Sequence, residues 1–449
     1  MKRIISLALC VLVLCVSAIT PGFAAFNAAL ETSADIVLLL NRDSGTVVFD
    51  KNADKVTAPA SLTKIATATV AIEHCSDLDA KVTVKQSSID AIAGTNSSTA
   101  GLLPGEVLTV RELLYCLLVR SANEAAVILA DYVGNGSVPA FVDMMNELAA
   151  SLGCENTHFV NPHGLDEPGH QSTARDIAKL TEHALELPLF SEIVNTVNYT
   201  LPATNKSGER NLLSTNWLIN PNFKTYYCEY AAGVKTGSTS DAGRCVVSTA
   251  SKDGYNYLGV VMGAPYEDVN GDGNPDNCAF LECKKIFEWA FDNLRMSKVA
   301  DTTRIVTVVD VTLSRKADHV RLVPASDVTA LVPVGNNENS VLIEPIPEET
   351  PQSVEAPVKK GDVLGKARIL YAESEIATVD LVAAEDVDVS LLLYIGHGIS
   401  QLFRSAVFLV IFALVLLVLA VYGFLVLRHK QQKKRRRAPK TVKNFRNLK

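Results

Sequence analysis

The sequence predicts an α/β (α+β) fold in which an antiparallel sheet is combined with a helical lobe. A small all-β domain and one C-terminal transmembrane helix are predicted to follow. Three observations lead to this prediction. Strand patterns occur over residues 35–50 and again after residue 232, with helical patterns between them. Short β-branched runs separated by turns begin near residue 303, and an uncharged apolar run covers residues 406–427.

The first 24 residues have the pattern of a secretory signal peptide. Lys2 and Arg3 precede an apolar run over residues 4–18, and Gly22 and Ala24 are small enough for cleavage after Ala24. We therefore expect the chain to be exported. Its length of 449 residues favours two folded domains in the mature part.

The first domain is predicted over residues 25–297 from patterns at both of its ends. Strands at residues 35–41 and 46–50 are joined by a turn at residues 42–45. The helical patterns between the two strand regions cover residues 61–74, 109–119, 123–132, 138–152 and 174–187. The later strands are predicted at residues 232–238, 244–251 and 257–263, followed by a helix at 279–294. One sheet built from both ends of the domain accommodates this order.

The second domain is predicted over residues 298–392, where β-branched runs alternate with turns. The main runs lie at residues 305–311, 320–323, 328–332, 340–346 and 376–383. Residues 393–405 are expected to link this domain to the membrane.

The apolar run over residues 406–427 can cross a bilayer, because a helix of this length spans about 33 Å. Residues 428–449 carry eleven Lys or Arg and no Asp or Glu, which predicts a cytoplasmic tail. Nucleic-acid binding by residues 433–437 is the alternative. A basic flank directly after a membrane span is already explained by topology, so we expect no nucleic-acid partner.

Charge and cysteine content restrict the remaining functions. The formal net charge is −7, but the cations of the tail and of the signal peptide leave −20 on residues 25–427. Bulk charge therefore argues against binding to anionic polymers. Seven cysteines remain in the mature chain, with the spacing of neither a zinc site nor a dense disulfide scaffold. Cys228 with Cys245, or Cys278 with Cys283, could pair outside the cell.

Ser61 and Lys64 form a Ser-x-x-Lys motif on one face of a predicted helix. A serine hydroxyl needs a neighbouring base to act as a nucleophile, and an amine of lowered pKa can be that base. The helix N-terminus adds backbone donors for an oxyanion. On its own the motif also fits a helix-capping Ser and a solvated Lys.

Two later motifs favour the catalytic interpretation. Ser121-Ala122-Asn123 and Lys235-Thr236-Gly237 follow in that order, at distances that let a helical lobe and a sheet meet at one site. This ordered triple is the signature of penicillin-recognising serine acyltransferases.

The sequence resembles the low-molecular-weight penicillin-binding proteins, the serine-type D-alanyl-D-alanine carboxypeptidases of bacterial cell walls. The resemblance extends over residues 35–294 and more loosely through the β domain to the anchor. Supporting stretches are residues 59–64, 161–165, 170–174, 261–264 and 359–365. It implies a serine acyltransferase fold of the β-lactamase/transpeptidase type for residues 25–297.

The resemblance also implies roles for single residues. Ser61 is the nucleophile and Lys64 its base, while Ser121 relays a proton to the departing D-alanine. The substrate-binding residues it implies are Asn123 for the acyl chain amide, Lys235 and Thr236 for the carboxylate, Gly237 for close backbone approach, and Ser238. The backbone N–H groups of Ser61 and Ser238 form the oxyanion hole. Lys235 also keeps Lys64 partly deprotonated by like-charge repulsion.

Several neighbouring residues have simpler interpretations. Asn161, His163 and His170 fit turn and packing positions, since the three motifs already supply every role. Arg244 could reach a substrate carboxylate, but it also fits an exposed strand position. Members of the family often carry an Arg shortly before the helix predicted at residue 279.

This chain instead has the acidic stretch of residues 268–276, which puts the carboxylate anchor in doubt. That stretch imitates the start of a calcium loop, but its twelfth position is Ala279 where a Glu is needed. A plain acidic loop is favoured, and neither a metal nor a cofactor is expected.

The resemblance implies that the protein removes the terminal D-alanine from peptidoglycan stem peptides and binds β-lactam antibiotics covalently. A β-lactamase is the nearest alternative, although no clear Glu-x-x-Leu-Asn segment is present. A membrane-anchored β-lactam sensor or an idle wall-binding module is the alternative from another class. The predicted location is the cell membrane, with a single span, an extracellular catalytic domain and a cytoplasmic tail.

Overall fold

The structure is a computed structural model that describes residues 30–336, 338–372 and 374–436. The predicted signal peptide and residues 437–449 of the basic tail lie outside the described residues. The chain divides into two compact units. The first contains the chain up to Ala300 together with Val328–Ile343 and Arg368–Thr378, and the second contains the rest.

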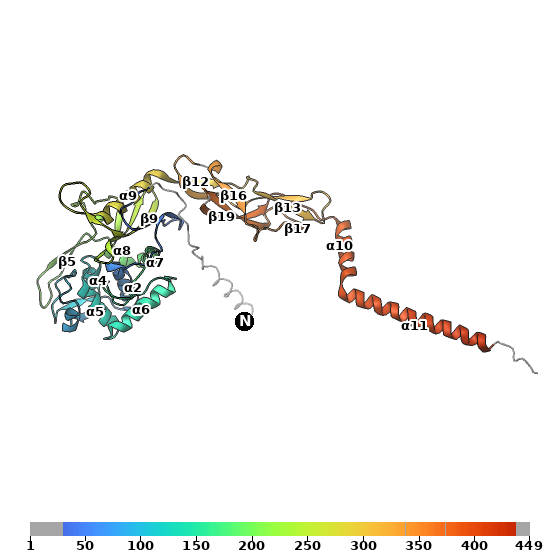
Figure 1. Cartoon of the computed structure of the whole chain (residues 1–449), viewed down its shortest axis with the longest axis horizontal. Helices are drawn as coiled ribbons and strands as arrows, with labels where there is room; N and C mark the ends of the chain where they lie inside the picture. The colour runs from blue at the N-terminus through green and yellow to red at the C-terminus, as the bar shows by residue number, and fades with distance from the viewer. Residues whose placement is uncertain (1–29, 337, 373, 437–449) are drawn as a thin grey trace, which may run out of the picture. The chain divides into compact units, whose positions relative to one another are not determined.

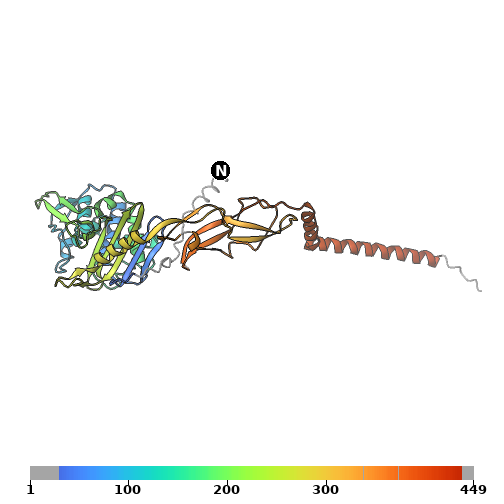
Figure 2. The ribbon, with the colours of Figure 1, turned by 90° about the horizontal axis from the view of Figure 1, so that it is seen from above.

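The first unit is built around a five-stranded antiparallel sheet with the order β2-β1-β9-β8-β7. These strands are β1 (Ile36–Asn41), β2 (Val47–Lys51), β7 (Ala231–Thr239), β8 (Gly243–Lys252) and β9 (Tyr255–Ala264). The strands lie side by side in Figure 2, where the blue N-terminal pair continues the green and yellow strands. The prediction of one sheet assembled from both ends of the domain is confirmed.

Alternating residues of the central strands supply two hydrophobic cores, one on each face of the sheet. In β1, Ile36 and Leu38 belong to one core, whereas Val37 and Leu39 belong to the other. Successive strand residues point to opposite faces, so a strand buried on both faces is apolar throughout. This explains why the first strand of the sequence is a continuous apolar run.

The larger core is shared with a helical lobe that covers one face of the sheet, as Figure 1 shows. Its helices are α2 (Lys64–His74), α4 (Val110–Leu118), α5 (Asn123–Val133), α6 (Val138–Ser151), α7 (Ala174–Leu185) and α8 (Pro188–Val194). The other face is covered by α9 (Cys278–Asn293), whose Cys283, Ile286 and Phe287 are fully buried.

Local signals in the sequence explain where these helices begin. The Thr109 hydroxyl caps α4 by accepting a hydrogen bond from the Glu112 N–H, and the Glu112 carboxylate accepts one from the Thr109 N–H. Such a capping box satisfies two backbone donors of the first turn. Thr173 caps α7 in a similar way through the Asp176 N–H.

The sequence did not predict α8 or the hairpin of β5 (Asn198–Leu201) and β6 (Arg210–Leu213). In the hairpin the apolar residues are few, so the strands carry a weak period-2 pattern. The seven cysteines of the described part are all unpaired, and six of them are buried. The two candidate disulfides are therefore not formed.

Residues 301–390 form an all-β domain, as predicted, although Val328–Ile343 and Arg368–Thr378 within it belong to the first compact unit. Its strands form a six-stranded sheet of order β16-β18-β19-β14-β13-β17. They are β13 (Thr307–Thr312), β14 (His319–Pro324), β16 (Leu342–Pro345), β17 (Ser353–Glu355), β18 (Val363–Tyr371) and β19 (Ser374–Ala383). The pairing of β13 with β14 is antiparallel, and that of β13 with β17 is parallel.

Two helices end the described chain. The predicted linker is helical in the structure, as α10 (Leu391–Arg404). It is followed by α11 (Ala406–Arg436), of which Ala406–Lys433 is long and apolar enough to cross a membrane. None of the residues in its most apolar window is buried within the protein. This helix agrees with the predicted apolar span.

Candidate active site

Ser61 lies in the short 3-10 turn η1 (Ala60–Thr63), directly before α2. The preceding residue, Ala60, has a φ of 48°, which is the left-handed conformation. L-residues with a side chain rarely adopt it, so the surrounding contacts must hold it. The turn therefore presents Ser61 at the end of α2 and not inside a regular helix.

Lys64 begins α2, and its side chain is completely buried. Its Nζ lies 2.8 Å from Ser61 Oγ, 2.6 Å from Asn123 Oδ1 and 2.6 Å from the carbonyl oxygen of His163. The amide and carbonyl oxygens can only accept hydrogen bonds. A neutral amine has two N–H bonds for these two acceptors, which leaves its lone pair directed at the Ser61 hydroxyl.

The environment of Lys64 favours this neutral amine. Burial and, secondarily, the charge of Lys235 hold the pKa of Lys64 well below its ordinary range, while Glu124 acts in the opposite direction. Burial also lowers the pKa of Lys235 to about 7. Desolvation disfavours the charged form of an amine, so burial is the main cause and repulsion the second.

The second motif lies between α4 and α5. Ser121 has a φ of 62° and is buried, and its Oγ accepts a hydrogen bond of 2.8 Å from Lys235 Nζ. Asn123 is the first residue of α5, and its backbone N–H donates to the Ser98 carbonyl at 2.9 Å. The structure thus brings all three motifs together, with Lys64 bonded to the second and Ser121 bonded to the third.

The third motif lies on β7, which is the last strand of the sheet. A Cβ atom at Gly237 would lie 3.2 Å from Ser61 N and 3.0 Å from Ala60 Cβ. A side chain at this position would press on the backbone of Ser61, so a glycine lets the strand pass close to it. The Thr236 hydroxyl lies 2.7 Å from that of Thr215, and the side chain of Ser238 is exposed beside it on the strand.

Comparison with known proteins agrees with this geometry. A family model described as D-alanyl-D-alanine carboxypeptidase matches residues 24–266, which is more than half of the chain. The chain belongs to the D-alanyl-D-alanine carboxypeptidase family. A second model, of the penicillin-binding protein 5 C-terminal domain, matches residues 305–389. The resemblance inferred from the motifs is confirmed.

Relatives of this carboxypeptidase cover most of its length. D-alanyl-D-alanine carboxypeptidase DacF of Bacillus subtilis is 29% identical over 80% of this chain and 86% of its own. DacA of Haemophilus influenzae is 30% identical over 80% of this chain and 86% of its own. Among solved structures, penicillin binding protein 5 from Haemophilus influenzae has a TM-score of 0.59 at 28% identity, covering 80% of this chain and 98% of its own. The Streptomyces K15 DD-transpeptidase has a TM-score of 0.53 at 31% identity, covering 59% and 98%.

A loop before α7 contacts Lys64 and the turn that carries Ser61 from one side. Besides the His163 carbonyl on Lys64, it contributes Gly164, whose φ is 88° and where a Cβ would lie 1.9 Å from the Ala60 oxygen. Asn161 Oδ1 accepts a hydrogen bond of 2.7 Å from the Gly164 N–H. Asn161 is thus a turn residue, as the sequence suggested.

His170 is connected to the turn that carries Ser61 through a chain of hydrogen bonds. The Val160 N–H donates to His170 Nδ1 at 3.0 Å, so a neutral ring must donate from Nε2. Nε2 lies 2.8 Å from the Thr63 hydroxyl, which donates to the Ala60 oxygen at 2.8 Å. Burial lowers the pKa of His170 to about 4, so the ring is neutral at pH 7. His170 therefore supports Ala60 in its left-handed conformation.

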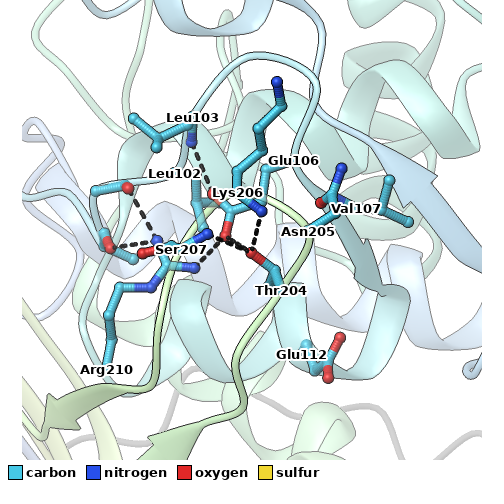
Figure 3. A network of polar contacts seen from close by, with 12 residues as sticks. Leu102, Leu103, Glu106, Val107, Glu112, Thr204, Asn205, Lys206, Ser207 and Arg210 are labelled. Carbon is cyan, nitrogen blue, oxygen red and sulfur yellow. Dashed lines mark hydrogen bonds and ion pairs between the residues drawn. The ribbon is translucent and has the colours of Figure 1, made fainter.

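A buried ion pair secures the segment that leads to Ser98 and Asn123. Figure 3 shows Arg210 of β6 directed at the carboxylate of Glu106, which is fully buried. Glu106 also accepts hydrogen bonds from Thr204 Oγ1 at 2.7 Å and from the Leu103 N–H at 2.8 Å. Arg210 donates in turn to the Gly101 oxygen at 2.8 Å.

Glu124 holds the same segment from the other side. Its Oε1 accepts hydrogen bonds from the Thr99 hydroxyl and the Ala100 N–H, both at 2.7 Å. Its Oε2 is buried without a hydrogen-bond partner. Because Glu124 follows Asn123, the loop and the second motif are fixed as one piece. Sequence reasoning missed this residue, since an acidic residue in a first helical turn is ordinary.

In the acidic stretch before α9, carboxylate side chains accept hydrogen bonds from backbone N–H groups of the same loop. Asp268 accepts backbone hydrogen bonds from Gly271 at 2.7 Å and from Gly273 at 2.8 Å. Within the described residues, no group of three or more His, Cys, Asp or Glu side chains is arranged to hold a metal ion. The geometry therefore suits an acidic loop that is closed by its own turns.

Proposed function

We propose that the protein removes the terminal D-alanine from peptidoglycan stem peptides through an acyl-enzyme on Ser61. The arrangement around Lys64 carries this proposal. Two pure acceptors occupy the N–H bonds of a neutral amine, and its lone pair faces the Ser61 hydroxyl at 2.8 Å. A nucleophile with a base in hydrogen-bond contact is the arrangement that acyl transfer requires.

In the first half-reaction Ser61 Oγ attacks the carbonyl carbon of the scissile bond, and its proton moves to Lys64 Nζ. The backbone N–H groups of Ser61 and Ser238 stabilise the oxyanion. Ser121, hydrogen-bonded to Lys235, relays the proton: it gives its hydroxyl proton to the nitrogen of the leaving D-alanine and takes one from Lys64 in return. The C–N bond then breaks, and an ester on Ser61 remains.

In the second half-reaction a water molecule attacks the ester carbonyl and gives a proton to Lys64, which returns a proton to Ser61 Oγ as the C–O bond breaks and the shortened peptide leaves. Asn123 binds the acyl chain amide, while Lys235 and Thr236 contribute to binding of the carboxylate. A β-lactam enters the same path at the first step, since its strained amide acylates Ser61. A sensor or an idle module would need no such complete set of proton carriers.

We also propose that α11 anchors the protein with its catalytic domain outside the cell and its tail in the cytoplasm. The cations after the apolar span support this orientation. One face of α10 carries exposed apolar side chains, namely Leu391, Leu392, Ile395, Ile399 and Phe403. Such a helix next to a span fits the membrane surface.

Protease digestion of intact protoplasts tests the orientation. Added protease should digest the extracellular part and spare a tag placed after Lys449. Digestion of that tag would contradict a cytoplasmic tail.

Release of D-alanine tests the activity. Diacetyl-Lys-D-Ala-D-Ala should lose one D-alanine per molecule with the wild-type chain, and Ser61→Ala should abolish release. A wild-type chain that hydrolyses benzylpenicillin rapidly, without release of D-alanine from the peptide, would support a β-lactamase instead.

A further inference from the structure

The substrate of the proposed reaction ends in a free carboxylate, and the cation that binds this group needs to be identified. Lys235 does not satisfy this group alone, because it is buried and its Nζ already donates to Ser121 Oγ and to the Thr236 oxygen. The segment between β9 and α9 contains no Lys or Arg. A carboxylate that leaves water is stabilised by a charge-assisted hydrogen bond, so another cation is expected near the site.

Arg244 lies in the position where such a cation is needed. It is the second residue of β8 and pairs with Ser238 of β7 in the antiparallel register. Its Nη1 donates a hydrogen bond of 2.8 Å to Ser238 Oγ. The N–H of the same Ser238 is the proposed oxyanion donor. A terminal carboxylate lies one residue beyond the scissile carbonyl, about 3.8 Å along the peptide, so the cation that binds it must lie close to the oxyanion donors.

The surroundings of Arg244 leave its guanidinium free for a ligand. The guanidinium stacks over the ring of Tyr266 at 4.2 Å from the ring centre, which fixes its plane. Among the ion pairs of the described residues, none includes Arg244. A guanidinium has five N–H donors, and its planar edge matches a carboxylate in a bidentate manner. Acidic residues outnumber basic ones between the signal peptide and the tail, so most arginines there would be expected to pair with a carboxylate. An arginine that is oriented but has no carboxylate partner is therefore unexpected.

We propose that Arg244 binds the terminal carboxylate of the substrate and thereby selects peptides with a free C-terminus. This assignment rests on the proposed carboxypeptidase activity. It answers the doubt that the sequence raised, because the acidic loop of residues 268–276 supplies no cation while β8 does.

The test compares a substrate acid with its amide. The full chain in detergent micelles is assayed with diacetyl-Lys-D-Ala-D-Ala and with the same peptide bearing a C-terminal carboxamide. Arg244→Gln should lower kcat/KM for the acid about 10- to 100-fold, the usual effect of losing a hydrogen bond to a charged group. The amide should change less than about threefold, and Arg244→Lys should retain part of the activity on the acid.

Lys252→Gln is the matched control, since Lys252 lies at the other end of β8 and also stacks on an aromatic ring, Tyr230, at 4.4 Å. It should leave both substrates unchanged. Equal losses on acid and amide in Arg244→Gln, or no loss on the acid, would overturn the assignment. A wild-type chain that releases neither D-alanine from the acid nor D-alaninamide from the amide would overturn the proposed activity, and the assignment with it.

Discussion

The buried ion pair of Glu106 and Arg210 allows the most quantitative prediction. Replacing Glu106 by Met leaves the Arg210 guanidinium, whose side chain is only 18% exposed, without a counter-ion. Breaking a buried pair in this way costs about 3–5 kcal/mol of the free energy of unfolding. For a domain of this size that corresponds to a fall in Tm of about 6–15 °C. The loss should also slow acylation, because the segment that supports Asn123 is released.

A double replacement distinguishes the ion pair from simple packing. Glu106→Met combined with Arg210→Met removes both charges, so most of the loss should be recovered, to within about 2 kcal/mol of the wild type. Thermal denaturation of the full chain in detergent provides the measurement. Glu182→Met is the matched control, because its bidentate pair with Arg42 is partly exposed and should cost less than about 1 kcal/mol. Equal costs for Glu106→Met and Glu182→Met would refute the reasoning.

Three further predictions concern the pH dependence and geometry of acylation. The acylation rate should rise with pH as Lys64 loses its proton, which gives the pH–rate profile a rising limb. Lys235→Met should move this rising limb to higher pH, because a charge that repels protonated Lys64 is removed. Glu124→Gln should move the same limb to lower pH, since it removes the charge that favours protonated Lys64; a limb that does not move would exclude this coupling. His170→Phe keeps a ring but cannot donate a hydrogen bond to Thr63. Acylation by a chromogenic β-lactam, followed by stopped flow, should therefore slow about tenfold, while the rising limb of the pH–rate profile stays at the same pH. A shifted limb with an unchanged rate would contradict a positioning role for His170.

The sequence allowed prediction of those parts of the fold and site that depend on local patterns. The two apolar runs and the turn at residues 42–45 predicted the first hairpin, and the three motifs predicted which side chains meet at Lys64. Contacts made by the backbone could not be predicted. Every residue has a carbonyl group, so the residue type of His163 does not show that its carbonyl oxygen contacts Lys64. The ion pair of Arg210 and Glu106 joins a hairpin to a loop more than 100 residues away along the chain. No local sequence pattern reveals such a contact.

The most direct measurement of the central claim is the mass of the purified chain after exposure to benzylpenicillin. The intact mass should increase by one equivalent of the antibiotic, and peptide mapping should place the adduct on Ser61. Lys64→Met should acylate far more slowly, and Ser61→Ala should remain unmodified. An adduct that persists in Ser61→Ala, or one that maps to another residue, would contradict the assignment of the nucleophile.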